Sequence, residues 1–171
     1  MKGYIHIYTG NGKGKTTAAF GLALRAVGAG KSVFIAQFVK GQPYSEIDAV
    51  NLFLPAITIK QYGLDCFIYK KPTEKDIQAA KNGLDEVTRM IAEANFDMVI
   101  LDEACIAIYY NLFTTGELIE TLRIKPESME IIITGRYATA ELIEFADLVT
   151  EMKEVKHYYT KGIEARKGIE F

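Results

Sequence analysis

The chain has 171 residues, of which 49% are hydrophobic and 25% charged, and its formal net charge is -2. This length and balance suit one globular domain with a sizeable core and exclude a largely disordered chain. The slight acidic excess argues against a protein that holds nucleic acid mainly by neutralising its phosphates, because such proteins carry a basic excess.

Short apolar runs alternate with longer amphipathic stretches, and they predict strands and helices respectively. The predicted elements are, in chain order, a strand at Tyr4–Tyr8, a helix at Thr16–Val27, strands at Ser32–Val39 and Ile57–Gln61, a long helix from Lys71 to about Asn95, a strand at Met98–Leu101, a helix at Thr115–Arg123, a strand at Glu130–Thr134, a helix at Ala138–Ala146 and a strand at Leu148–Val155. Thr73, with Asp76 three residues later, is the expected N-cap of the long helix.

The alternation of strands with helices indicates the fold class. Strands that are apolar on both faces are typical of an α/β domain with a mostly parallel sheet and helices on both faces, in three layers. No linker rich in Pro, Gly or Ser divides the sequence, so residues 1–171 are expected to form a single domain. The final segment, Lys156–Phe171, has no clear period.

Signals for export or membrane insertion are not evident in the sequence. No apolar run approaches the roughly 20 residues that cross a bilayer, and Met1–Tyr4 leads straight into a strand-like segment without a signal-peptide pattern. The two cysteines, Cys66 and Cys105, are too few for a disulfide framework and lack metal-ligand spacing. These features predict a cytoplasmic protein that has reduced thiols and no membrane association.

A loop rich in glycine and lysine, Thr9–Thr17, lies between the first strand and the first helix. Its sequence TGNGKGKTT matches the phosphate-binding pattern G-x-x-x-x-G-K-[ST], except that Thr9 stands at the first glycine position. Backbone N–H groups of such a loop and the positive end of the next helix form an anion cradle. Lys15 adds a positive charge and Thr16 a hydroxyl that can bind Mg²⁺. The loop therefore predicts a nucleoside triphosphate with Mg²⁺.

Two acids, Asp102 and Glu103, directly follow a predicted strand. Ligands of open α/β sheets bind at the carboxyl edge of the strands, so either acid can hold Mg²⁺ opposite Thr16, directly or through water. The sequence leaves open which acid contacts the metal, and whether both are merely solvated or stabilise a helix N-terminus. Arg136 follows another strand and Gly135, so it is expected at the same edge.

A P-loop alone does not define the reaction. Hydrolysis needs a group that orients water against the γ-phosphate, and Glu103 is the candidate for it. A small-molecule kinase needs an acceptor site and usually further arginines. A third alternative is a module that binds ATP without consuming it and changes its affinity for a partner. Neither histidine suggests a zinc site, and His6 is expected in the core.

Several blocks, taken together and in order, resemble one family. They are TGNGKGKTTAAFG (9–21), RAVGAGK (25–31), QFVKG (37–41), MVILDE (98–103), IIITGR (131–136), ADLVTEM (146–152) and VKHYYTKGIEARKGIEF (155–171). This series is similar to the P-loop type ATP:corrinoid adenosyltransferases, also called cob(I)yrinic acid a,c-diamide adenosyltransferases, over essentially the whole chain. The most diagnostic parts are the phosphate loop and the C-terminal block.

The resemblance implies a RecA-like P-loop fold, a homodimer and a specific reaction. Co(I) of a corrinoid (cobalamin, cobinamide or cobyrinic acid diamide) attacks C5′ of ATP, triphosphate leaves, and a cobalt–carbon bond forms. The nucleotide is expected to lie in reversed sense, with its γ-phosphate where other P-loop proteins hold the α-phosphate. ATP is then a cosubstrate, Mg²⁺ the metal with Mn²⁺ as a substitute, and a flavodoxin-like reductase a transient partner. The tail gains a role in closing over the nucleotide or corrin site.

The resemblance also implies residue roles by position. Triphosphate binding is assigned to the loop residues Gly10, Asn11, Gly12, Lys13, Gly14, Lys15, Thr16 and Thr17. Metal binding is assigned to Thr16 and Glu103, with Asp102 alongside. Lys15, Thr16 and Glu103 form the expected catalytic set.

Further residues are expected to border the two substrates. Arg25 would fix the nucleoside end of ATP, Arg136 would contact the nucleotide, and Gln37, Phe38 and Lys40 would border the site. Relatives carry a Gly-Phe-x-Trp type stretch whose aromatic residues cover the lower face of the corrin. This chain has Gly63–Tyr69 at that place and no tryptophan, so Leu64 and Phe67 are the candidates for this role.

Overall fold

The structure is a computed structural model that describes residues 2–41, 44–64 and 71–171. Within these ranges, six parallel strands form one sheet in the order β3-β2-β4-β5-β1-β6. The strands are β1 (Ile5–Thr9), β2 (Val33–Phe38), β3 (Ile57–Tyr62), β4 (Met98–Asp102), β5 (Glu130–Thr134) and β6 (Leu148–Glu151). The predicted α/β architecture is confirmed, and the sheet is parallel throughout rather than only mostly so.

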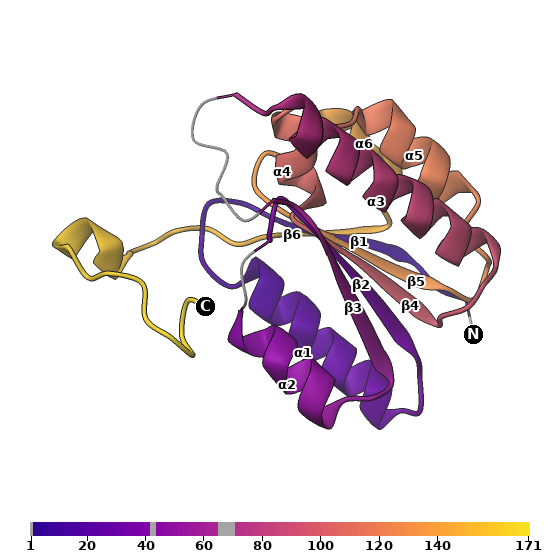
Figure 1. Cartoon of the computed structure of the whole chain (residues 1–171), viewed down its shortest axis with the longest axis horizontal. Helices are drawn as coiled ribbons and strands as arrows, with labels where there is room; N and C mark the ends of the chain where they lie inside the picture. Colours follow the sequence, from indigo (N-terminus) through magenta and orange to yellow (C-terminus); the bar gives the residue numbers. More distant parts are fainter. Residues whose placement is uncertain (1, 42–43, 65–70) are drawn as a thin grey trace.

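Helices cover both faces of the sheet. Figure 1 shows α1 (Lys15–Gly28) and α2 (Ser45–Phe53) on one face, and α3 (Glu74–Ala92), α4 (Ala104–Tyr109), α5 (Thr115–Arg123) and α6 (Ala140–Phe145) on the other. Each face has its own buried apolar cluster, in which Ala19, Ala23 and Ala26 of α1 serve the first. None of the helices in the described ranges is long and apolar enough to cross a membrane.

Two short helices, α2 and α4, were not predicted, and neither has a clear sequence signal. In α2 and at its C-cap the apolar residues Ile47, Val50 and Leu54 have helical spacing, but the helix is short, no side chain caps it, and the exposed Leu52 and Phe53 obscure the pattern. In α4 nearly every side chain is apolar, and four of the six residues are buried against the sheet and its neighbours. A helix buried almost all round is indistinguishable by period from a continuous apolar run.

The elements that were predicted carry the expected local signals. Thr73 caps α3, because its hydroxyl accepts a hydrogen bond from the Asp76 N–H and the Asp76 carboxylate accepts one from the Thr73 N–H. The last strand, β6, ends at Glu151 rather than Val155 and is exposed along its length at one edge of the sheet.

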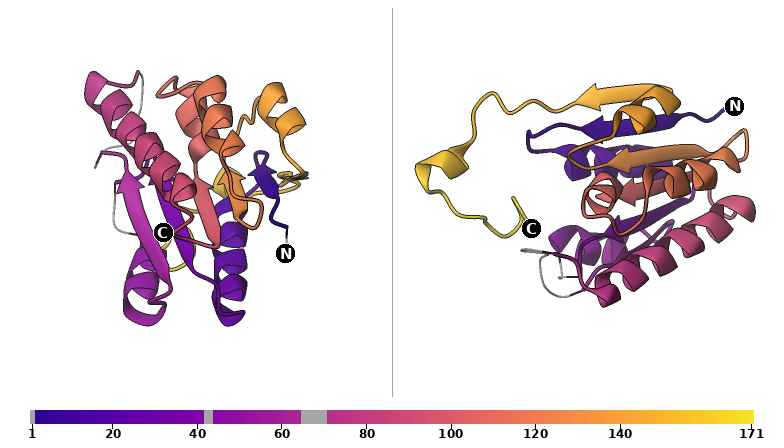
Figure 2. Two further views of the ribbon diagram at one scale, coloured as in Figure 1. Left: turned by 90° about the vertical axis from the view of Figure 1, so that its right-hand side faces the viewer. Right: turned by 90° about the horizontal axis from the view of Figure 1, so that it is seen from above.

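The strand order determines which loops meet. The loops that follow β1, β2, β4 and β5 leave the same edge of the sheet, because all the strands are parallel. The tail after β6 extends beyond this edge, forms one 3₁₀ turn, η1 (Tyr158–Lys161), and turns back toward it (Figure 2). The P-loop, the acidic pair and the C-terminal segment are thus brought to one place.

Candidate active site

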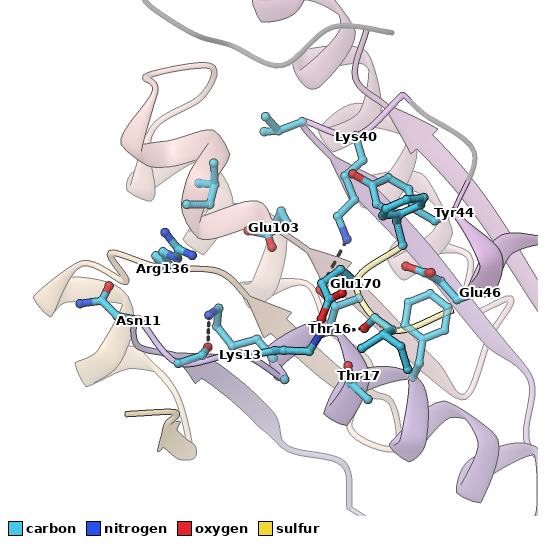
Figure 3. Close-up of a pocket in the computed structure, with 18 of the residues that line it drawn as sticks. Asn11, Lys13, Thr16, Thr17, Lys40, Tyr44, Glu46, Glu103, Arg136 and Glu170 are labelled. Carbon is cyan, nitrogen blue, oxygen red and sulfur yellow. Dashed lines mark hydrogen bonds and ion pairs between the residues drawn. The ribbon is translucent and has the colours of Figure 1, made fainter. Parts of the chain in front are cut away.

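A cavity of about 980 Å³ opens at the carboxyl edge of the sheet (Figure 3). The P-loop and the start of α1 form its floor, the loops after β2, β4 and β5 form its walls, and the segment 168–171 of the tail lies across it. This volume is at the upper end of the roughly 300–1,000 Å³ that is typical of small-molecule sites. The cavity is therefore large enough for a nucleotide.

The P-loop is closed around its own lysine in the structure. Nζ of Lys15 donates hydrogen bonds to the carbonyl oxygens of Gly10 and Gly12, each over 2.8 Å, and the residue is buried. Burial lowers the pKa of Lys15, an effect partly opposed by the nearby Glu103. Lys15 must therefore turn away from its loop to bind a phosphate oxygen.

Gly12 is held by the segment that follows β6. Its N–H donates to the carbonyl oxygen of Met152 over 2.6 Å, and a Cβ on Gly12 would lie only 2.7 Å from that oxygen. Only glycine fits this approach. The N–H of Gly12 therefore stabilises the loop in this state, while Gly14, with φ +113°, starts α1.

Asp102 lies behind the cavity with no exposed surface, and its carboxylate accepts four hydrogen bonds. Oδ1 accepts from Thr16 Oγ1 (2.9 Å) and Thr134 Oγ1 (2.7 Å). Oδ2 accepts from Gln37 Nε2 (3.1 Å) and Lys40 Nζ (2.8 Å). Burial alone would raise the pKa of Asp102, but the Lys40 charge and these hydrogen bonds outweigh it, so the pKa is lowered and the group is a carboxylate.

Glu103 differs from its neighbour because its side chain faces the cavity (Figure 3). Its backbone is left-handed, with φ +60°, and its N–H donates to Thr134 Oγ1 over 3.0 Å. This conformation is unfavourable for a residue other than glycine and is typical of functional sites. Burial, followed by the charge of Asp102, raises the pKa of Glu103. The pair therefore combines a buried carboxylate, whose oxygens already accept four hydrogen bonds, with a carboxyl group that faces the cavity.

The structure brings most of the predicted site residues together. Those that line the cavity are Asn11, Gly12, Lys13, Gly14, Lys15, Thr16, Thr17, Glu103 and Arg136. The carbonyl oxygen of Gly10 accepts a hydrogen bond from Nζ of Lys15. Asp102 and Gln37 lie just behind the wall, where Gln37 is fully buried and bonds to both Asp102 and Gln61.

Four further predicted residues are not placed on this cavity, and one of them, Phe38 at the end of β2, is fully buried in the apolar core. Arg25 lies in the last turn of α1, exposed and about 14 Å along the helix from Thr16. Leu64 is partly buried beside Gly41 and does not line the cavity, and Phe67 lies outside the described residues. The roles suggested for these residues stay predictions.

Several cavity residues were missed by the sequence reasoning. Tyr44 and Glu46 lie at the start of α2, which was not predicted. Tyr109 and Tyr137 form a stacked pair with ring centroids 4.3 Å apart at the opposite wall. A tyrosine carries no sequence signal that it faces a ligand, so only the fold reveals these residues.

The tail is attached to the P-loop by a defined contact. Nζ of Lys13 donates to the Glu170 carboxylate over 2.6 Å and to the carbonyl oxygen of Ile169 over 2.7 Å. Tyr158 and the backbone of Arg166 also bond to Glu170. The Ser45 hydroxyl donates to the carbonyl oxygen of Phe171, which joins the tail to α2. The expected closure of the tail over the site is therefore present.

Comparisons with known proteins agree with this geometry. A family model described as "ATP:corrinoid adenosyltransferase BtuR/CobO/CobP" matches residues 1–171. The chain is 39% identical over 172 residues to the corrinoid adenosyltransferase of Escherichia coli K12, covering 99% of this chain and 86% of that protein. It is equally similar to the corrinoid adenosyltransferase CobA of Salmonella typhimurium, with the same coverage. The corrinoid adenosyltransferase of Pseudomonas aeruginosa is 32% identical and covers 99% of this chain and 84% of its own length.

A solved structure shares the fold. The crystal structure of the flagellar accessory protein FlaH from Methanocaldococcus jannaschii superimposes with a TM-score of 0.61 at 17% identity, covering 88% of this chain and 71% of that one. At this identity the likeness concerns the fold alone. The sequence matches extend over the P-loop, the acidic pair and the tail, and the chain therefore belongs to the ATP:corrinoid adenosyltransferase family.

Proposed function

We propose that the protein transfers the 5′-deoxyadenosyl group of ATP to Co(I) of a corrinoid and releases triphosphate. In this reaction a cobalt lone pair attacks C5′ of the ribose and a Co–C bond forms. The C5′–O bond breaks, its electron pair leaves with the triphosphate, and cobalt changes formally from Co(I) to Co(III). The observation that carries the proposal is the full-length family match combined with a P-loop that opens on a nucleotide-sized cavity.

The loop residues have the chemistry that such a leaving group requires. Negative charge grows on the triphosphate as the C–O bond breaks, so positive groups fixed beside it stabilise the transition state. Lys13, Lys15 and Arg136 line the cavity and carry that charge. We assign Lys15 to the triphosphate after it leaves Gly10 and Gly12. The corrinoid supplies the nucleophile itself, so the protein contributes mainly position and electrostatics.

The residues at the loop fit a magnesium ion. The Thr16 hydroxyl and the Asp102 carboxylate are hard oxygen donors that lie within hydrogen-bond distance of each other, and Glu103 faces the same cavity. An ammonium group, that of Lys40, already rests against Thr16 and Asp102, which supports a cation site there. We assign Mg²⁺ to Thr16 with Asp102 and Glu103. When bound, the metal neutralises charge on the triphosphate.

A second reading, hydrolysis or phosphoryl transfer, has one observation in its favour. Glu103 faces the cavity and its pKa is raised, which suits a general base. The adenosyl transfer requires no general base, because Co(I) is already a strong nucleophile. The two reactions also differ in their products: triphosphate in one case, and inorganic phosphate or ADP in the other.

An anaerobic assay tests the proposal directly. The protein is mixed with ATP, Mg²⁺ and chemically reduced corrinoid, and both the corrin absorption spectrum and the phosphate products are followed. We expect an adenosylcorrinoid spectrum and one triphosphate for each corrinoid converted. Release of inorganic phosphate or ADP at the same rate without corrinoid would support the hydrolase or kinase instead.

The remaining assignments rest on the family. We propose that residues 1–171 act as one catalytic domain in a cytoplasmic homodimer and that a flavodoxin-like reductase supplies the electron. We propose Arg25 for the nucleoside end of ATP, and Leu64 and Phe67 for the lower face of the corrin. Leu64→Ala should then impair turnover from Co(II) more than turnover from chemically supplied Co(I), and equal losses would remove this role.

A further inference from the structure

One of the four groups that bond to Asp102 differs from the others. Thr16, Thr134 and Gln37 offer neutral groups on short side chains that belong to α1, β5 and β2. Lys40 offers a full positive charge on a long flexible stem, from the turn after β2. Its side chain is 14% exposed and lines the cavity. Lys40 is therefore the member of this group that can leave without disrupting the sheet.

The Lys40 ammonium occupies a place that suits a metal ion. Its Nζ lies 2.8 Å from Oδ2 of Asp102 and 3.5 Å from Oγ1 of Thr16, so one cation faces both oxygen donors. Figure 3 shows Lys40 and Thr16 pointing toward each other across the cavity. These are two of the oxygen ligands that the proposed function assigns to Mg²⁺. Two cations cannot share this position, because like charges at such separation repel strongly.

The residue before Lys40 has a strained backbone conformation. Val39 has φ +60°, a left-handed conformation that is a genuine outlier for a β-branched residue. Strain of this kind persists where the surrounding structure requires it, typically at functional sites. The ring of Tyr44 lies 5.1 Å from Nζ of Lys40, so the ammonium that pairs with Asp102 also rests against an aromatic ring.

We propose that Lys40 is a resident counter-ion of the metal subsite. In the nucleotide-free protein its ammonium balances the buried Asp102 carboxylate. When Mg²⁺ and a triphosphate enter together, Lys40 leaves Asp102 and turns toward the triphosphate, which supplies the negative charge to receive it. The inference deepens the proposed function and rests on it for the identity of the metal ligands.

A consequence is that the free protein binds a divalent cation weakly. A metal ion that arrives alone must displace a charged hydrogen bond, and such bonds contribute about 1.5–3 kcal/mol. Removing the ammonium should therefore strengthen nucleotide-free metal binding by about tenfold or more. Lys40 positions the metal and phosphate charges and is not itself a catalytic residue.

The first experiment measures Mn²⁺ binding without nucleotide by electron paramagnetic resonance of the free ion. Lys40→Met should bind Mn²⁺ at least about tenfold more tightly than the unmutated protein, and Asp102→Asn added to it should abolish the gain. Lys60→Met is the matched control, because Lys60 also pairs with a carboxylate, that of Glu86, but does not line the cavity. Equal Mn²⁺ affinity in Lys40→Met and the unmutated protein would overturn the inference.

The second experiment needs no folded variant at this position. The side-chain nitrogen resonance of Lys40 is followed in the unmutated protein by NMR while Mg²⁺ and inorganic tripolyphosphate are added. We expect the Lys40 signal to change while that of Lys60 does not, and an unchanged Lys40 signal would overturn the inference. Corrinoid adenosylation by the unmutated protein tests the proposed function separately. If adenosylation occurs while Lys40→Met leaves Mn²⁺ affinity unchanged, only the role of Lys40 is lost.

Discussion

Lys15 illustrates how the nucleotide-free loop is stabilised by the same side chain that the ligand needs. Its ammonium is buried and bonded to two carbonyl oxygens of its own loop. To displace these two neutral carbonyl oxygens, a phosphate oxygen must form a stronger hydrogen bond with the Lys15 ammonium. It does so because it carries a negative charge. The exchange of partners leaves Lys15 satisfied in both states, so the cost of binding is small.

Lys15→Ala should weaken ATP binding by about ten- to a hundredfold, because a hydrogen bond to a charged group contributes about 1.5–3 kcal/mol. Adenosylation should fall with it, since the leaving group loses a cation. Isothermal titration with ATP and Mg²⁺ measures the affinity. Lys75→Ala, at an exposed position of α3, is the control and should leave the affinity unchanged. An unaltered affinity in Lys15→Ala would remove Lys15 from the phosphate site.

Glu86 gives a prediction for pH dependence away from the site. Its carboxylate accepts hydrogen bonds from Lys60 and from the Tyr62 hydroxyl, and the bond from Lys60 contributes most to a lowered pKa of Glu86. A lowered pKa stabilises the folded state above the ordinary value of 4.5, and this stabilisation is lost as pH falls through the folded pKa. Glu86→Gln should therefore cost up to about 1 kcal/mol near neutral pH, and this cost should shrink as pH falls below 4.5 and through the lowered pKa of Glu86.

Urea denaturation of both proteins across this pH range measures the difference. Glu127→Gln is a suitable control, because Glu127 is exposed and its carboxylate has no partner among the described residues. A difference between Glu86→Gln and the unmutated protein that stayed constant down to low pH would contradict the assigned ion pair.

The acidic pair marks the limit of what a sequence reveals at the residue scale. The position of Asp102 and Glu103 at a strand end was predictable, because the apolar run before them is short and flanked by polar residues. Which of the two is buried and which faces the cavity was not predictable, since it depends on Thr134 and Lys40, which are distant in sequence. Glu103 faces the cavity from a left-handed backbone conformation, which its sequence neighbours do not predict.

At the scale of elements, signals local to the sequence were reliable and those that depend on packing were not. The long helix α3 was predictable, because it carries both an apolar stripe and a capping residue, Thr73. The helix α2 is short, has no side-chain cap and buries only Val50, so its place in the cavity wall emerges only from the fold. The tail was recognisable by family resemblance alone, because its contacts with the P-loop, through Lys13, join segments more than 150 residues apart.

Glu170 is the residue that anchors the tail. Its carboxylate accepts hydrogen bonds from Lys13, Tyr158 and the N–H of Arg166. Glu170→Gln should loosen the tail, because an amide replaces the charged acceptor of an ion pair. Tryptic cleavage after Arg166 should then become several-fold faster, as followed by mass spectrometry.

The matched control is Glu164→Gln in the same tail, at an exposed position without a partner among the described residues. It should be cleaved at the rate of the unmutated protein. If both variants were cleaved equally fast, the ion pair between Lys13 and Glu170 would not be what holds the tail.

At the scale of the whole molecule, one inserted strand organises the site. β5 lies between β1, which leads into the P-loop, and β4, which ends in the acidic pair. The Thr134 hydroxyl at its end bonds to Asp102 and accepts from the Glu103 N–H, so it spaces the acids from the loop. The P-loop therefore forms the side of the cavity that suits phosphates. The opposite wall carries the aromatic pair Tyr109 and Tyr137.

This division predicts which part of ATP stabilises the protein. If the loop grips the triphosphate, inorganic tripolyphosphate with Mg²⁺ should raise the melting temperature nearly as much as ATP, and adenosine should raise it little. At a ligand concentration of about 100 times Kd the gain is about 2.7 kcal/mol, which corresponds to roughly 5–10 °C for a chain of this size. Thermal unfolding measured by circular dichroism with each ligand tests this, and Lys15→Ala should lose the response to tripolyphosphate. The contrary result is that adenosine stabilises the protein as much as ATP does and tripolyphosphate does not stabilise it. The nucleoside, and not the phosphates, would then provide the affinity. The role of the loop in binding the leaving group would have to be abandoned.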